Sequence, residues 1–185
     1  MFLKFARLPA CVTYWEVVLA FAFAVSCRSK QVPLSSDLKM SDKLSERQLI
    51  DGFYQVEANQ WRWAARRFAV VLPTPVGSQK SGVVVKLNFY VPDFQIESLG
   101  PMTLDAHVGD VSLGAETFTK GGIFTYTREI PPGAINGAII PVVFEFDKSR
   151  QAGEADARDI AAIVNEVLLQ RTHVTSSTLL RTQLR

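Results

Sequence analysis

The stretch that decides the fold is Val83-Val-Val-Lys-Leu-Asn-Phe-Tyr-Val91, which lies between Gly82 and Pro92. Apolar residues occupy every second position, and the positions between them include Lys86 and Asn88. Successive side chains of a β-strand point to opposite faces of a sheet, so this alternation places one set in a core and the other on a second surface. The stretch therefore predicts a β-strand with one buried face.

Similar alternation, separated by turn residues, continues on both sides of this strand. Gly109-Asp110 and Gly121-Gly122 each supply a glycine where a two-residue hairpin turn needs a positive φ, so each pair predicts a hairpin. Pro131-Pro-Gly133 ends the segment before it, because proline cannot donate to a central ladder. Further strands are predicted at 53–57, 61–72, 102–108, 117–119, 124–126 and 139–146, where Pro141 indicates an edge or a bulge. This pattern predicts an all-β fold, an antiparallel β-sandwich of jelly-roll or immunoglobulin-like type.

The segment 156–170 is ambiguous from its residues alone. Its apolar residues fit one face of an amphipathic helix, and the local pattern slightly favours a helix over a strand. These residues are Ile160, Ile163, Val164, Val167 and Leu168.

Several short motifs carry a resemblance to a known kind of domain. They are Gly52-Phe-Tyr-Gln-Val-Glu57, Trp61-Arg-Trp63, Pro131, Phe144-Glu-Phe-Asp147 and Asp156-Ala-Arg-Asp-Ile160. In this respect 53–169 resembles a small β-sandwich domain of exported bacterial lipoproteins, similar to non-catalytic modules near cell-surface glycan enzymes. The resemblance implies a closing strand over 160–169. It implies no activity, because the family has no established one.

The beginning of the chain has the order of an export signal. Lys4 and Arg7 precede the apolar run Val17-Val-Leu-Ala-Phe-Ala-Phe-Ala-Val25. Positive charge, then an apolar segment of about 7–15 residues, then small residues, is the pattern of a cleaved signal peptide. Ala24-Val-Ser-Cys27 resembles the lipobox of bacterial lipoproteins, in which the cysteine thiol takes a diacylglycerol and becomes the mature N-terminus. We therefore predict a lipoprotein-type signal peptide over 1–26 and lipidation of Cys27.

Three other interpretations of the leader stay open. The protein could be secreted after cleavage behind Ala24, without a lipid. The segment could be an uncleaved anchor, although a spanning helix needs about 20 apolar residues and Glu16 interrupts the run. Met40 could also be the true start of a cytosolic protein.

The rest of the chain divides into a tether, a domain and a tail. Residues 27–49 are polar and rich in serine, without a sustained apolar period, so they predict a flexible tether. The β-sandwich domain is predicted over 50–169, a usual length for a single core. Residues 170–185 are rich in threonine, serine and arginine and predict a frayed C-terminal tail.

Composition argues against several kinds of function. Both cysteines, Cys11 and Cys27, precede the domain, which therefore has no thiol for a disulfide, a nucleophile or a cysteine-ligated metal. Removal of 1–26 takes away two basic residues and one acidic residue, so the formal net charge falls from +2 to +1. A chain so close to neutral has no electrostatic reason to bind nucleic acid. No cofactor is predicted, because Gly121-Gly122 is followed by strand residues instead of a helix that could hold a phosphate.

Four aromatic side chains are candidate ligand contacts: Tyr54, Trp61, Trp63 and Tyr90. Exposed aromatic rings stack on the apolar faces of sugars. Trp61 and Trp63 share one strand face, however, and aromatic side chains of this size more often belong to the core. Tyr90 points away from Leu87 and Phe89 and is the better single candidate for exposure.

Charged clusters give weaker candidates. Arg62, together with Arg66 and Arg67, could bind a carboxylate or a phosphate, although surface ion pairs are the commoner use. Asp147, Glu154, Asp156 and Asp159 could offer oxygen ligands to Ca²⁺, but their spacing matches no defined calcium loop. We predict no metal site and expect a solvated loop in which Arg158 contacts Asp156 or Asp159.

The residue inventory gives little support to catalysis. His107 is the only histidine within the predicted domain, and Asp105 lies on the same strand face. No serine occupies a Gly-x-Ser-x-Gly turn, so a Ser-His-Asp site has no sequence support. We predict that the domain is not an enzyme.

These observations predict an exported lipoprotein of the cell membrane or outer membrane. Its β-sandwich is predicted to be a non-catalytic binding module, with an envelope glycan as its ligand. The alternative is a structural lipoprotein that binds another envelope protein through a sheet edge or an apolar patch. A hydrolytic enzyme is the weakest alternative.

Replacing Cys27 with serine tests the leader. We expect Cys27→Ser to abolish acylation and leave an unprocessed precursor, because the thiol is the atom that receives the lipid. Intact mass of the membrane fraction, with Cys11→Ser as the matched control, measures both effects. Unchanged processing and unchanged membrane attachment in Cys27→Ser would contradict the lipoprotein interpretation.

Overall fold

The computed structural model describes residues 33–153 and 156–172. Cys27, the predicted signal peptide and 173–185 of the predicted tail lie outside the described residues. The strands are β1 (Asp37–Lys39), β2 (Leu49–Glu57), β3 (Trp61–Pro73), β4 (Val83–Val91), β5 (Met102–Val108), β6 (Val111–Ser112), β7 (Glu116–Phe118), β8 (Gly122–Ile130), β9 (Ile139–Phe146) and β10 (Ala162–Arg171). The short helices are η2 (Lys43–Gln48), α2 (Ser78–Ser81), α3 (Asp93–Leu99) and η3 (Pro132–Ala134). Within the described ranges, no helix is long and apolar enough to cross a membrane.

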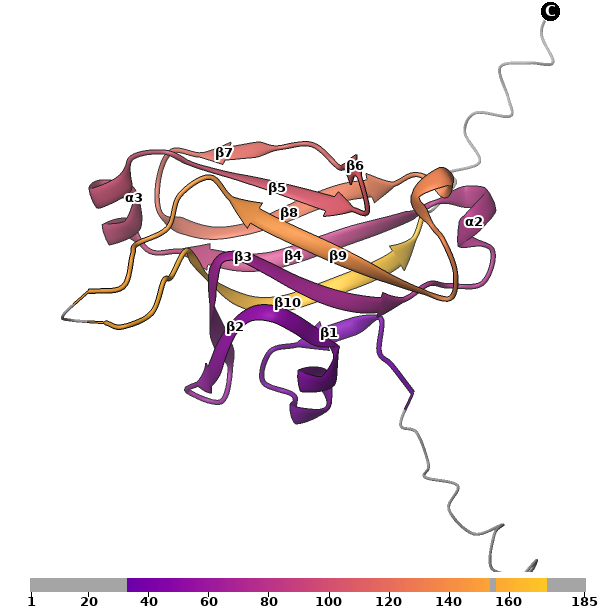
Figure 1. Cartoon of the computed structure of the whole chain (residues 1–185), viewed down its shortest axis with the longest axis horizontal. Helices are drawn as coiled ribbons and strands as arrows, with labels where there is room; N and C mark the ends of the chain where they lie inside the picture. Colours follow the sequence, from indigo (N-terminus) through magenta and orange to yellow (C-terminus); the bar gives the residue numbers. More distant parts are fainter. Residues whose placement is uncertain (1–32, 154–155, 173–185) are drawn as a thin grey trace, which may run out of the picture. The chain divides into compact units, whose positions relative to one another are not determined.

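The strands form one curled antiparallel sheet with the order β6-β5-β9-β3-β10-β4-β8. In addition, β1 pairs with β10, β2 with β3, and β7 with β5. The long strand β3 pairs with β10 through 62–64 and with β9 through 67–73, so it takes part in both halves of the sheet. In Figure 1 the strands β5 and β9 pass over β8 and β4. The prediction of an all-β, antiparallel sandwich is confirmed.

The core lies between the two halves of the sheet. All five apolar residues of the β4 alternation, from Val83 to Val91, are 0% exposed. Phe89 makes an edge contact with Phe146, and Phe68 stacks on Phe144 at a ring distance of 5.2 Å. Full burial of each such ring stabilises the fold by about 1.5–3 kcal/mol. The period of two in 83–91 is therefore the pattern of a core strand, as predicted.

The ambiguous segment is a strand, β10, as the resemblance implied. Its ladder with β4 shifts register between Val164 and Glu166, so Asn165 is an extra residue in a bulge. The inward side chains are therefore Ala162 and Val164 before the bulge and Val167 and Leu169 after it. The residues that fit a helical face come from both faces of this strand, because Val164 and Val167 point inward whereas Ile163 and Leu168 point outward. Apolar residues on both faces of a strand can therefore imitate a helical period, which explains why the local pattern favoured the wrong element.

Within the predicted tether over 27–49, the described residues from Ser35 onward belong to the folded domain, so the prediction is corrected there, whereas 27–32 lie outside the described residues. Leu38 and Met40 are 0% exposed, and β1 pairs with 166–168 of β10. Gln48 is 1% exposed and accepts from Ser35 N at 2.7 Å. The domain therefore begins near Ser35, and it uses residues that a start at Met40 would omit. At the other end, β10 extends to Arg171, two residues into the predicted tail.

The two glycine pairs have different outcomes. Gly109 lies in a hairpin, because Val108 of β5 pairs with Val111 of β6. Gly121-Gly122 does not form the predicted hairpin, since β7 pairs with β5 whereas β8 pairs with β4. A Cβ at Gly121 would lie 2.7 Å from the backbone nitrogen of Asp93, so the glycine is needed for close approach to α3.

Pro141 lies where β9 has one neighbour. The ladder between β5 and β9 covers 143–146 of β9, while β3 continues beside it to Ile139. Pro141 is exposed and pairs with Val71 of β3. The predicted edge at this proline is confirmed.

Leu38 and its neighbour Lys39 test whether β1 belongs to the domain. Leu38→Ala should lower the free energy of unfolding by about 2–5 kcal/mol, because it empties a fully buried site. Lys39→Ala, at an exposed position of the same strand, should change it by less than about 0.5 kcal/mol. Urea denaturation of the two variants gives both values, and equal small effects would mean that β1 is not part of the core.

Candidate functional site

The outer face of β8, β4 and β10 carries a row of large side chains. Ile123 of β8 pairs with Tyr90 of β4, which pairs with Ile163 of β10. Ile163 in turn pairs with Trp63 of β3. Directly paired residues of an antiparallel ladder point to the same face, so the four side chains form one row across four strands. This is the face opposite to the core side chains of β4.

A hollow of about 490 Å³ lies over this row. We call it the aromatic hollow; its lining residues are Trp61, Asn88, Phe89, Tyr90, Ile123, Ile163 and Asn165. Ile123 is 84% exposed, and Trp61 and Tyr90 are partly exposed. The structure therefore brings two of the predicted contacts, Trp61 and Tyr90, into one open site.

Trp63 lies beside Trp61 but does not line this hollow. Its ring lies 5.9 Å from the ring of Trp61 at an interplanar angle of 89°, and 6.5 Å from the ring of Phe94 on α3. Trp63 is only 9% exposed. Edge contacts of this kind contribute about 0.5–1.5 kcal/mol beyond burial. The prediction of Trp63 as a direct contact is corrected, since its ring is covered and holds Trp61 in place.

Polar side chains adjoin the aromatic row on the same face. Asn88 Nδ2 donates to Glu166 Oε2 at 2.8 Å, and Thr125 Oγ1 donates to Asn88 Oδ1 at 2.8 Å. These two bonds fix the orientation of the Asn88 amide. An amide nitrogen has two N–H donors and a carboxylate has two accepting oxygens, so both groups keep capacity for a further partner. The outer face therefore combines flat apolar surface with oriented hydrogen-bonding groups.

Asn88, Ile123, Ile163, Asn165 and Glu166 belong to the site but are absent from the residues predicted by sequence. The alternation of 83–91 does place Asn88 on the same face as Tyr90. Nothing local places Ile163 beside Tyr90, because that contact depends on the register of β10 and on its bulge.

Tyr54 lies apart from the aromatic hollow and is held by the protein itself. Its hydroxyl donates to the Asp159 backbone oxygen at 2.8 Å, and the Arg158 guanidinium lies 5.5 Å from the ring centre. Arg158 also contacts Asp156 at 2.9 Å and Glu57 at 2.7 Å. Tyr54 therefore fastens β2 to the loop before β10.

The expected contact between Arg158 and Asp156 is confirmed. Hydrogen bonds from the Arg158 side chain, and then from its backbone, lower the pKa of Asp156 to about 2. The pKa of Arg158 is raised, first by its bond to Asp156 and then by its bond to Glu57. Across 33–153 and 156–172, no group of three histidine, cysteine or acidic residues is placed to hold a metal ion.

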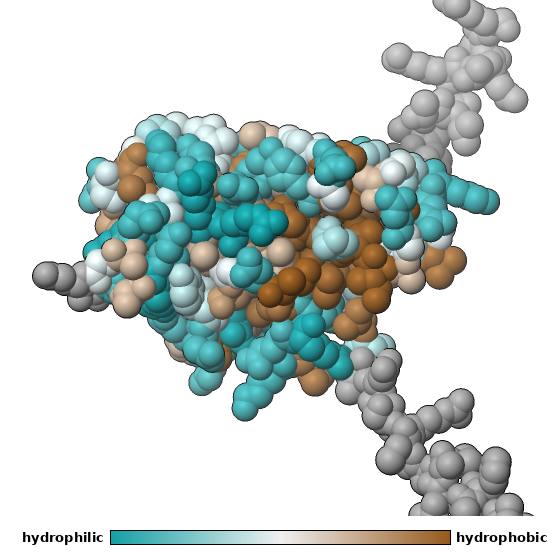
Figure 2. Space-filling view, in the orientation of Figure 1, coloured by the Kyte–Doolittle hydropathy of each residue, from teal (hydrophilic) through white to brown (hydrophobic). Residues whose placement is uncertain are grey.

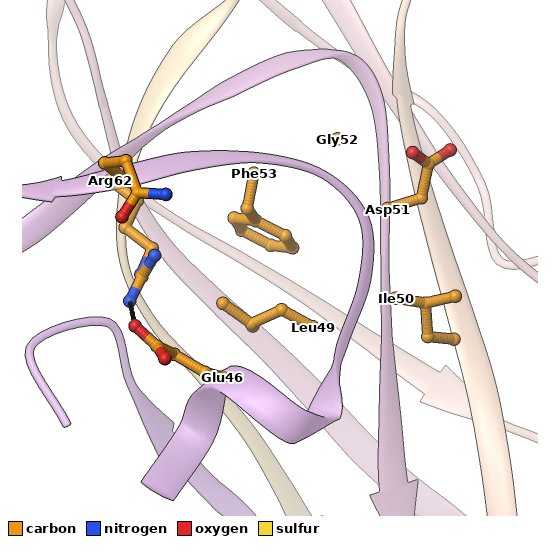
Figure 3. A pocket seen from close by; sticks show the side chains of 8 residues that line it. Glu46, Leu49, Ile50, Asp51, Gly52, Phe53 and Arg62 are labelled. Atoms are coloured by element: carbon orange, nitrogen blue, oxygen red, sulfur yellow. Dashed lines mark hydrogen bonds and ion pairs between the residues drawn. The ribbon is translucent and has the colours of Figure 1, made fainter. Parts of the chain in front are cut away.

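Arg62 faces inward, which corrects its interpretation as an anion ligand. It is 5% exposed, and it donates to the Met40 oxygen at 3.2 Å, to the Tyr54 oxygen at 3.0 Å and to Glu46 Oε1 at 2.7 Å. Figure 3 shows Arg62 at one wall of a hollow of about 370 Å³, with its guanidinium directed at Glu46. Asp51 lies on the opposite side of this hollow. Arg62 therefore joins η2 and β2 to β3.

Arg66 and Arg67 form surface ion pairs. Arg66 lies 3.6 Å from Glu145, and Arg67 lies 3.7 Å from Asp51. All four side chains are between 42% and 65% exposed, so each pair adds little stability. This agrees with the expectation that arginines such as Arg66 and Arg67 more often form surface ion pairs than anion sites.

His107 and Asp105 lie together without the arrangement of a catalytic triad. His107 Nε2 is 3.3 Å from Asp105 Oδ2, and the Ser112 hydroxyl donates to both carboxylate oxygens of Asp105. A Ser-His-Asp relay needs the serine hydroxyl on the imidazole. Here the carboxylate lies between the other two groups, so this cluster gives no support to hydrolysis by a serine nucleophile.

Comparisons with solved structures give distant structural likenesses, two of which are given below. No family model matches the chain, and no curated protein does. The chain is similar to an acetyl xylan esterase from the rumen bacterium Butyrivibrio proteoclasticus, with 11% identity over 78% of this chain and 35% of that chain, at a TM-score of 0.39. It is also similar to a structure described as CBM4, with 12% identity over 73% of this chain and 84% of that chain, at a TM-score of 0.33. Similarity of this degree carries no argument about function, which rests on the site itself.

Fluorescence can report on this site, because the chain has three tryptophans and Trp15 lies in the predicted signal peptide. In the processed protein we expect Trp63→Phe to leave a red-shifted emission that acrylamide quenches, from the partly exposed Trp61. Trp61→Phe should leave a blue-shifted emission that acrylamide quenches weakly. Equal quenching in both variants would contradict the covered position of Trp63.

Proposed function

We propose that the β domain is a non-catalytic carbohydrate-binding module and that the aromatic hollow is its site. The observation that supports this most strongly is the joint exposure of Trp61 and Tyr90 beside the bonded group of Asn88, Glu166 and Thr125. A sugar ring has apolar C–H faces and hydroxyl groups at its rim. The hollow offers rings for the faces and oriented donors and acceptors for the rim.

The ligand is proposed to be an envelope glycan, because we also propose that the protein is exported and held at a membrane through a lipid on Cys27. The leader sequence supports this location, and the absence of cysteine from the domain agrees with it. A lipid-anchored module would bind glycan strands that lie close to the membrane. The proposed binding site lies on an open face of the sheet, so an extended glycan chain can pass across it.

Binding at the hollow is favoured over catalysis by the chemistry of its lining. None of the described residues that line the hollow has a carboxylate, and the adjoining Glu166 already accepts from Asn88. Glycoside hydrolysis commonly uses two carboxyl groups about 5–10 Å apart on either side of the bond. The lining instead consists of rings, aliphatic side chains and amides, which suits retention of a sugar.

Polysaccharide retention tests this proposal. Trp61→Ala and Tyr90→Ala should each weaken binding to insoluble peptidoglycan or envelope polysaccharide about 2- to 13-fold, since one aromatic contact contributes about 0.5–1.5 kcal/mol. Thr127→Ala is the matched control, because Thr127 is an exposed residue of the same face that does not line the hollow. Pull-down of the processed full-length protein, with thermal denaturation as a check on folding, gives the ratio.

Two results would contradict the proposal. Wild-type protein that binds none of the envelope polysaccharides would remove the glycan as ligand. Equal retention of Trp61→Ala, Tyr90→Ala and Thr127→Ala would place binding somewhere other than the aromatic hollow.

A further inference from the structure

The other outer face of the domain carries an apolar area on β3 and β9. Three successive cross-strand pairs consist only of apolar residues, namely Pro73 with Ile139, Val71 with Pro141, and Ala69 with Val143. The next pair along the strands is charged, Arg67 with Glu145. We call the six apolar residues the apolar panel. Figure 2 shows a brown area, interrupted by paler residues, over the right-hand part of β3 and β9.

The panel is accessible to a large partner. Ile139 is 48% exposed, Pro141 is exposed, and Val71, Pro73 and Val143 are partly exposed. Ile50 of β2, which is 55% exposed, precedes Asp51, the residue that pairs with Ala69 of the panel. Single exposed apolar residues are ordinary on a protein surface, but contiguous ones mark interaction sites.

The chain enters the domain beside this panel. Gln48 Nε2 donates to the Ser35 oxygen at 2.9 Å and to the Val71 oxygen at 2.8 Å. Ser35 N donates back to Gln48 Oε1 at 2.7 Å. One buried side chain therefore holds Ser35 against the strand that carries Val71. The position of the chain entry relative to the panel is fixed.

The length of chain before Ser35 limits how far the panel can lie from a membrane. Cys27 precedes Ser35 by eight residues, and eight residues span at most about 28 Å when fully extended. A domain of this size has a radius of gyration of about 14 Å. A lipid on Cys27 therefore keeps the entry point within about one domain diameter of the bilayer. An anchor that ended at Val25 would add only two residues.

We propose that the apolar panel docks on the lipid bilayer, with Ile139 and Pro141 in the headgroup region. This inference rests on the proposed anchoring at Cys27 and goes beyond the proposed glycan site. A short linker brings the panel to the bilayer at high effective concentration, so a small apolar area is sufficient for contact. The aromatic hollow lies on the outer face of the opposite half of the sheet. Docking through the panel would direct the hollow away from the membrane, towards the glycan.

Nitroxide labelling of the full chain tests the docking. The domain has no cysteine, so Ile139→Cys in a Cys11→Ser background gives one new thiol, and the background protein without it measures residual labelling at Cys27. Ile123→Cys is the matched control, an exposed isoleucine in the aromatic hollow. Each protein is reconstituted into vesicles of phosphatidylethanolamine and phosphatidylglycerol. Collisions with oxygen and with a water-soluble nickel complex are then compared by electron paramagnetic resonance.

We expect the label at 139 to favour oxygen, at a depth of about 5–10 Å below the surface, and the label at 123 to favour the nickel complex. Val143→Cys gives a second position in the panel if the first variant folds poorly. Vesicle-bound protein with both labels in water would overturn docking and leave the anchor intact. Protein that stays in the supernatant would overturn the anchor and the docking with it. Shielding of 139 in native membranes but not in pure lipid would also overturn the proposal, in favour of a protein partner.

Discussion

The pairing of β10 with three other strands is the constraint on which the rest of the structure depends. This strand joins β4 along most of its length, β3 through 162–164 and β1 through 166–168. The extra residue in its bulge, Asn165, accepts from the Met40 backbone nitrogen at 2.9 Å. The segment before β2 therefore provides a hydrogen-bond partner for the backbone of the bulge. Asn165, the bulge residue, also lines the aromatic hollow. Loss of β1 would disturb the core and the binding face together.

Much of the fold can be predicted from the sequence because strand alternation is a local property. In 83–91, 102–108 and 139–146 the period of two identifies the buried face correctly, and Pro141 marks the end of a neighbouring strand. Pairing is not local. Gly121-Gly122 has the composition of a hairpin, yet its flanking strands belong to different halves of the sheet. The apolar residues on the two faces of β10 together imitate a helical period, so the residues alone do not identify it as a strand.

The N-terminal segment shows the limit of reading apolar periods. Leu38 and Met40 are two apolar residues in a polar stretch, and a three-residue strand is too short to display a period. Gln48 is polar in sequence but buried in the fold, where its amide replaces a backbone partner for Ser35 and Val71. The candidate site shows the same limit. Trp61 and Tyr90 can be chosen as aromatic residues, but their meeting depends on where β10 lies between β3 and β4.

The corrected start of the domain changes what the leader implies. A tether of 23 residues over 27–49 would leave the domain free to turn in any direction, with an extended reach of about 80 Å. A linker that ends at Ser35 has about a third of that reach, and Gln48 fixes the side of the domain from which it leaves. For the proposed anchor at Cys27, the proposed orientation then follows from two features on opposite faces: the apolar panel beside the linker and the aromatic hollow across the core. The proposed glycan-facing orientation therefore depends on residues 35–49, which the sequence predicts as part of a flexible tether.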